Sequence, residues 1–99
     1  MSTPRWIEPP DDLPETARTY WKHYASGLRA NGELTPERCE KFALLCRLLA
    51  LVSAASASME ADGVTIRSKT GVAKANPAAA VLLSTQRPVR DLMHAFGIG

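Results

Sequence analysis

The chain has 99 residues, of which 45% are hydrophobic and 22% are charged, a balance typical of one small globular domain rather than of a disordered chain. Its most apolar stretch, Phe42 to Ala57, is interrupted by Arg47 and by serines, so we expect no membrane-spanning segment. The first residues lack the apolar core of a signal peptide, and we therefore expect a cytoplasmic protein.

Residues 1–11 are expected to form an extended N-terminal arm. Prolines at positions 4, 9 and 10 disfavour regular structure there. Trp6 and Ile7 are the apolar side chains of this arm that can dock on the rest of the chain. Residues 12–99 are expected to form a single helical domain.

A first helix is predicted from about Pro14 to Ala30. Asp12 is the expected N-cap, and proline suits the first turn of a helix. Asn31 and Gly32 are suited to the backbone that ends it. One face carries apolar residues at helical spacing, which predicts burial: Ala17, Trp21, Tyr24 and Leu28.

A second, longer helix is predicted to begin at Thr35 and Pro36, a capping residue followed by a favoured first residue, and to end at Gly63. Its apolar positions nearly follow a seven-residue repeat, the pattern of a helix that packs lengthwise on another helix. They are Cys39, Phe42, Ala43, Cys46, Leu49, Ala50, Ser53 and Ala57. Such a stripe serves equally as core or as subunit interface. The interface candidates are Phe42, Cys46, Leu49 and Ser53.

The stretch GVTIRSKTGVAKANP, from Gly63 to Pro77, separates this helix from a third. Its β-branched residues followed by a turn signal predict a short β-hairpin or an ordered loop. Asn76 should cap the third helix, which we expect to reach about Phe96 and to be kinked or broken at Pro88. The predicted fold is therefore all-α: a hairpin of two long helices plus a third, kinked helix.

Charge is divided unevenly along the chain. Residues 1–62 contain seven Lys or Arg and nine Asp or Glu, whereas residues 63–99 contain five basic residues and one acidic residue. A basic half favours an anionic partner, and phosphate contacts would come from Arg67, Lys69, Lys74, Arg87 and Arg90. The alternative is a solvated connector whose lysines keep a strand edge from pairing.

No catalytic signature is present. The chain has no phosphate loop, nucleophile elbow, dinucleotide fingerprint or zinc motif. Cys39 and Cys46 are seven residues apart, too far for a disulfide within one helix, and His23 and His94 are interpreted as ordinary helix residues. We expect no enzymatic activity, no metal site and no cofactor.

The order of these pieces resembles the small terminase subunits of cohesive-end tailed phages and their prophage relatives. The resemblance rests on PPDDLPETARTYWKHYASGLRANGELTPERCEKFALLC, MEADGVTI, TGVAKANPAAAV and LMHAFGIG. It implies a helical subunit that forms rings, binds double-stranded viral DNA in the bacterial cytoplasm and delivers it to the large subunit. That large subunit holds the ATPase and nuclease activities of genome packaging.

Two features depart from the family. Relatives commonly continue beyond the position of Gly99 with a proline-containing tail, and Pro88 interrupts a helix expected to be smooth. An alternative function is a small helical adaptor that binds a protein partner without DNA. The two interpretations differ in what they predict for Arg67, Lys69 and Lys74, whose neutralisation should weaken DNA binding only if the chain is a terminase subunit.

Overall fold

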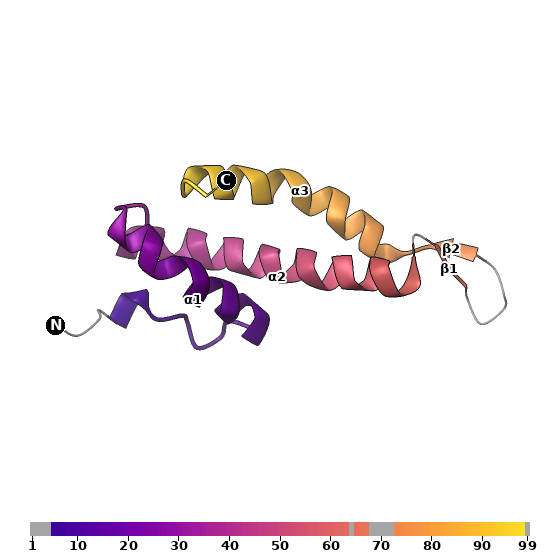
Figure 1. Ribbon diagram of the computed structural model, residues 1–99, viewed down its shortest axis with the longest axis horizontal. Coiled ribbons are helices and arrows are strands. Elements are labelled where there is room, and N and C mark those ends of the chain that lie inside the picture. Colours follow the sequence, from indigo (N-terminus) through magenta and orange to yellow (C-terminus); the bar gives the residue numbers. More distant parts are fainter. Residues whose placement is uncertain (1–4, 64, 68–72, 99) are drawn as a thin grey trace.

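The structure is a computed structural model that describes the backbone of residues 5–63, 65–67 and 73–98 and the side chains of residues 5–63 and 75–98. These described residues form three α-helices, α1, α2 and α3, two short 3-10 helices and a two-stranded ribbon. The molecule is elongated, about 60 × 24 × 18 Å. Figure 1 shows α3 lying along α2, α1 crossing the first part of α2 obliquely, and the ribbon at one end. The predicted all-α architecture is confirmed.

Helix α1 spans Glu15–Ala30, close to the predicted range. Its N-cap residue is Pro14, and no side chain caps it, so the assignment of Asp12 as N-cap was wrong. Asp12 instead pairs with Arg47 on α2, with 3.2 Å between Oδ2 and Nη2. At the other end Gly32 has φ 76°, and the amide of Glu33 donates to the carbonyl of Leu28 at 2.8 Å, as in a Schellman motif.

The N-terminal arm differs from the expected extended chain. Arg5–Ile7 forms a 3-10 helix, η1, which packs on α1. The indole Nε1 of Trp21 donates a buried hydrogen bond of 2.7 Å to the carbonyl oxygen of Ile7, whose side chain is also buried. The proline-rich sequence did not exclude this single turn, because a 3-10 turn needs only three residues and gains a partner for a buried indole.

Helix α2 spans Cys39–Asp62 and follows the 3-10 helix η2, Pro36–Arg38, whose N-cap residue is Thr35. The predicted start is therefore confirmed in position, although the Thr35 side chain makes no capping bond. Gly63, with φ 78°, ends α2 as predicted. Residues 36–62 do meet the length and composition criteria of a membrane span, contrary to our expectation. The buried N-terminal part of α2 instead fits the core helix of a small domain.

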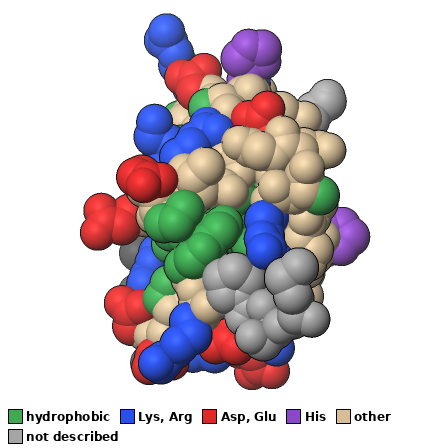
Figure 2. Space-filling model, turned by 90° about the vertical axis from the view of Figure 1, so that its left-hand side faces the viewer, with side chains coloured by type: hydrophobic (Ala, Val, Ile, Leu, Met, Phe, Trp, Pro, Cys, Tyr) green, Lys and Arg blue, Asp and Glu red, His purple; other side chains and the backbone are tan. Residues whose placement is uncertain are grey.

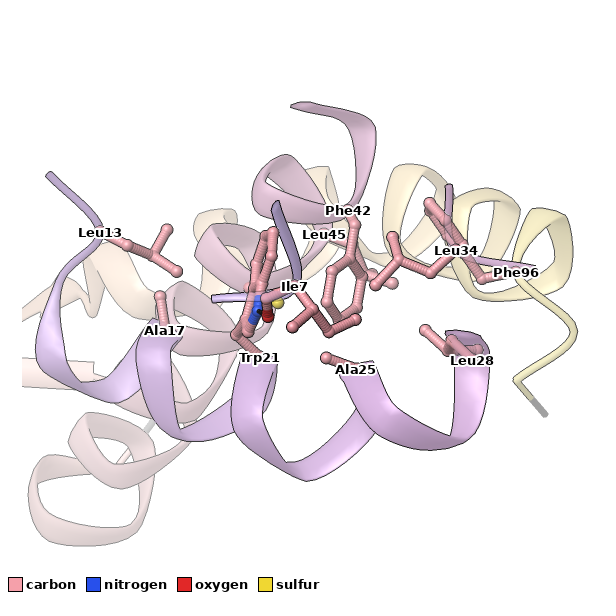
Figure 3. Close-up of a cluster of buried hydrophobic side chains, with 11 residues drawn as sticks. Ile7, Leu13, Ala17, Trp21, Ala25, Leu28, Leu34, Phe42, Leu45 and Phe96 are labelled. Carbon is pink, nitrogen blue, oxygen red and sulfur yellow. Dashed lines mark hydrogen bonds between the residues drawn. The ribbon is translucent and has the colours of Figure 1, made fainter. Parts of the chain in front are cut away.

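The core lies where α1, the first half of α2 and the end of α3 meet. Phe42 stands at its centre, 4.6 Å from the ring of Trp21 and 5.5 Å from that of Phe96, measured between centroids. Figure 3 shows these rings with the smaller side chains of α1 around them. The cluster comprises Ile7, Leu13, Ala17, Trp21, Ala25, Leu28, Leu34, Phe42, Leu45, Cys46 and Phe96. Burial of this aromatic centre ties the three helices together.

The ribbon consists of β1, Thr65–Arg67, and β2, Ala73–Ala75, paired antiparallel. Asn76 anchors its base: the side-chain nitrogen donates to the carbonyl of Gly63 at 2.9 Å, and the side-chain oxygen accepts from the amide of Ala78 at 3.0 Å. The predicted cap of the third helix is thus confirmed. The same side chain also joins the end of α2 to the start of α3.

Helix α3 spans Pro77–Ala95, with Pro88 inside it. The helix is continuous through the proline, so the predicted break does not occur, and Figure 1 shows α3 changing direction along its length, as a kink would. Gly97, with φ 71°, closes the helix. Arg38 then fastens this end, because Nη2 donates to the carbonyl of Ala95 at 2.6 Å and the guanidinium lies 4.4 Å from the centroid of Phe96.

Candidate functional site

An apolar hollow of about 720 Å³ lies along α3, beside the second half of α2. Arg90 and His94 supply the ionisable groups of its lining, and Gln86 a neutral polar one. Its apolar wall is formed by Val52, Leu82, Leu83, Val89, Met93 and Ile98. We call it the α3 hollow. Its size falls within the range of hollows that hold an apolar ligand or the side chains of a partner protein.

Leu83 is the most exposed large apolar residue at this hollow, with 76% of its surface accessible. Helix α2 is also only partly covered: 22% of the residues in its most apolar 18-residue stretch are fully buried within the chain, and the others are partly buried or exposed. Helix α1 packs near the N-terminal part of α2 and leaves the C-terminal half to α3 alone (Figure 1). Such exposed apolar surface is typical of a protein–protein contact site.

A second hollow of about 420 Å³ lies elsewhere on α2. Its apolar lining comes from Pro10, Ala43 and the half-exposed Leu44, and Glu40 and Asp12 supply carboxylates. Arg47, which also lines it, is occupied by its ion pair with Asp12. We call it the α2 hollow. Its unpaired charge is therefore negative, whereas the charge of the α3 hollow is positive.

Two of the predicted basic residues, Arg87 and Arg90, lie on α3. Both are exposed, and neither forms an ion pair with a described side chain. Arg90 lines the α3 hollow, whereas Arg87 lies outside it. Both follow the ribbon by more than a turn of helix, since ten residues of α3 separate Pro77 from Arg87, about 15 Å along the axis.

Of the other three predicted basic residues, Arg67 belongs to β1 and Lys74 to β2. Lys69 is outside the described residues, and for Arg67 and Lys74 the structure describes the backbone. Arg67 is paired with Ala73, and Lys74 with Ile66. Successive residues of a strand alternate between faces, so this register assigns Arg67 and Lys74 to opposite faces of the ribbon.

The predicted interface residues fall in different environments. Phe42 and Cys46 have 0% exposure and belong to the chain's own core, so they are not surface residues, because α1 and α3 already cover this part of α2. Leu49 is partly buried against the same core. Ser53 is exposed beyond the end of the core cluster. The accessible apolar surface is formed instead by residues flanking this stripe.

The two cysteines are free and differ in access. Burial raises the pKa of the Cys46 thiol to about 12. The pKa of the Cys39 thiol is also raised, by burial first and by the nearby Glu37 carboxylate second. Both thiols are therefore protonated at neutral pH, which disfavours reaction as nucleophiles. The interpretation of these cysteines as small core residues fits this environment.

Sequence reasoning missed both hollows. Leu83 and Leu44 were not singled out, because an isolated leucine at the edge of a helical stripe gives no signal that it stays uncovered. The hint available was the excess of apolar residues on α2 over what the short α1 can cover. Figure 2 views the molecule from the left-hand side of Figure 1 and shows, at the end of the molecule that holds the core, hydrophobic side chains exposed between charged ones.

Fold and surface together define a small helical protein with exposed apolar hollows of opposite charge. Comparison with protein families gives a more specific result: residues 17–98 match the family described as phage terminase, small subunit. The chain belongs to this family, and its role is in phage DNA packaging. No curated protein and no solved structure matches the chain.

Proposed function

We propose that this chain is the DNA-binding subunit of a phage packaging terminase, which assembles into a homo-oligomeric ring and delivers viral DNA to the large subunit. The family match over residues 17–98 is the observation that carries this proposal. The chain would act without catalysing a reaction itself, in the cytoplasm of the bacterial host. The ATPase and nuclease would belong to the large subunit.

DNA contact is assigned to the ribbon and to the exposed side of α3. Arg67, Lys69 and Lys74 lie in a stretch without acidic residues, and Arg67 and Lys74 belong to opposite faces of a two-stranded ribbon. A ribbon with basic residues on both faces suits a DNA groove, where phosphates line both walls. Arg87 would add a further phosphate contact. Arg90 is not assigned to DNA contact, because it lines the apolar α3 hollow.

Assembly is supported by the uncovered surface of α2 and α3. A 99-residue chain buries a modest fraction of its apolar surface alone, and here part of the apolar α2 stretch stays exposed. Association of copies would remove that surface from water. Of the interface residues predicted from sequence, Leu49 and Ser53 remain available to such a contact, whereas Phe42 and Cys46 are occupied in the core.

The test of DNA binding is the triple variant Arg67→Ala, Lys69→Ala, Lys74→Ala, measured by fluorescence anisotropy on a mixed-sequence DNA duplex over a series of salt concentrations. Each lost phosphate contact lowers the slope of log K against log salt by about 0.9, so three contacts would lower it by roughly 2.7.

The matched control removes three exposed basic residues elsewhere, Arg5→Ala, Lys22→Ala, Lys41→Ala. It changes the net charge equally, so it corrects for the general electrostatic attraction of the chain to DNA. An equal loss in both variants would place the DNA contact elsewhere. A wild-type chain that binds no duplex, even in low salt, would instead favour the protein adaptor.

A further inference from the structure

The two hollows differ in charge and lie on different sides of α2. Ala43 lines the α2 hollow and Val52 lines the α3 hollow. Nine residues separate them, about two and a half helical turns, so the two positions face opposite sides of the helix. A copy of the chain that binds one neighbour through one hollow therefore keeps its other hollow free for a second neighbour.

Exposed leucines stand at both surfaces. Leu83, 76% exposed, lies at the α3 hollow, and Leu44, 49% exposed, lies at the α2 hollow. Leu51, 46% exposed, is seven residues from Leu44 and so continues the same side of α2. These are the large apolar residues that stay exposed in the described part of the chain, and two of them, Leu83 and Leu44, line a hollow.

The ionisable groups at the two surfaces are complementary. Arg90 and His94 line the α3 hollow, and neither is in an ion pair with a described residue. At the α2 hollow, Arg47 is paired with Asp12, which leaves the Glu40 carboxylate without a described ion-pair partner. Opposite charges around two apolar centres favour contact of one surface with the other over contact of either surface with itself.

We infer that the α3 hollow of one copy binds the α2 hollow of the next, with Leu83 set against Leu44 and Ala43, and Arg90 facing Glu40 of the neighbouring copy. This contact is heterologous, because each copy uses two different surfaces. Repetition of such a contact closes into a ring when the rotation between copies permits. The inference rests on the proposed function, which supplies the homo-oligomeric ring. It adds which two surfaces meet and that the contact is heterologous.

Charge reversal on the full chain tests the pairing, read out by native mass spectrometry and light scattering at moderate salt. Arg90→Glu and Glu40→Arg each place like charges across every contact, and each is expected to weaken association about tenfold or more. Lys22→Glu is the matched charge-reversal control, since Lys22 is exposed on α1 and lines neither hollow. It should keep the wild-type oligomer.

Mixing the two variants gives the decisive result. An Arg90→Glu copy and a Glu40→Arg copy can alternate around a ring, because each contact then joins one acidic and one basic residue. The equimolar mixture should therefore recover oligomers, with even numbers of subunits. Circular dichroism of each variant alone verifies that it is folded.

The outcomes separate this pairing from the proposed function. If either single variant keeps the wild-type oligomer, or if the mixture stays dissociated, the pairing is wrong although a DNA-binding ring can still form through another surface. A wild-type chain that stays monomeric at every concentration overturns both the pairing and the proposed ring, and the duplex-binding measurement then decides whether DNA binding survives.

Discussion

At the scale of single residues, the core depends on a few side chains that each do more than fill space. Trp21 packs against Phe42 and also holds the carbonyl of Ile7 through its indole nitrogen. Phe96 packs against Phe42, and its ring makes a cation–π contact with the guanidinium of Arg38. Through these two rings the N-terminal turn and the end of α3 are attached to the same point on α2.

Trp21→Phe should lower the free energy of unfolding by about 1–3 kcal/mol, because the buried carbonyl of Ile7 loses its hydrogen bond. Urea denaturation followed by circular dichroism measures the change. Tyr20→Phe, on the same helix, is the control: its hydroxyl makes no hydrogen bond to a described residue, so the change should stay below about 0.5 kcal/mol. Equal stability of Trp21→Phe and wild type would show that the indole bond does not hold the turn.

The thiol of Cys46 should make stability fall at alkaline pH. Its folded-state pKa is about 12, above the ordinary value of 9.0, so above pH 9 the unfolded chain loses the thiol proton while the folded chain keeps it. The free energy of unfolding therefore decreases as the pH rises from 9 towards 12. Urea denaturation of wild type and Cys46→Ala below and above pH 9 checks this, since the variant should show the smaller decrease. Parallel pH profiles would contradict it.

At the scale of elements, the ends of the helices are determined by local chemistry. Gly32, Gly63 and Gly97 all adopt positive φ at the ends of the three helices, and Asn76 with Pro77 starts α3. These rules act within four or five residues, which explains why the sequence predicted all of these boundaries. Asp12 failed as a cap because α1 begins at Glu15, which leaves Asp12 two residues before the N-cap position Pro14, where it pairs with Arg47 instead.

Two glycines of the α1 region should respond oppositely to alanine. Gly27 lies inside α1 with open space around it, whereas Gly32 has φ 76°. Gly27→Ala should stabilise the chain by about 0.5–1 kcal/mol through helix propensity, and Gly32→Ala should destabilise it by about 1–2 kcal/mol through the left-handed backbone. Thermal denaturation distinguishes the signs. A stabilising Gly32→Ala would mean that the turn relaxes to another conformation.

At the scale of the whole molecule, a small aromatic core lies at one end of an elongated chain. The other end consists of the second half of α2, the start of α3 and the ribbon (Figure 1). Among the described side chains of this part, the buried apolar ones are Ala55 and Ala78, and Asn76 contributes its hydrogen bonds. This half therefore has little core of its own and would gain most from contact with other copies.

The apparent melting temperature should rise with protein concentration, because association stabilises the folded state by mass action. Differential scanning calorimetry over a hundredfold range of concentration measures the shift. Arg90→Glu, which is expected to weaken association, should melt at a temperature that is nearly independent of concentration. A concentration-independent wild type would indicate that the folded chain gains no stability from copies of itself.

The amino-acid sequence by itself determined the helices, their ends and the all-α class, because caps, glycine stops and apolar spacing act locally. It also carried the family resemblance, which the match over residues 17–98 confirmed. Only the tertiary structure decided which apolar residues are core and which are surface. Phe42 and Leu83 look alike in a helical stripe, but α1 and the end of α3 cover Phe42, and no described element covers Leu83. Burial depends on the lengths and placement of neighbouring helices, and no single stretch of sequence contains that information.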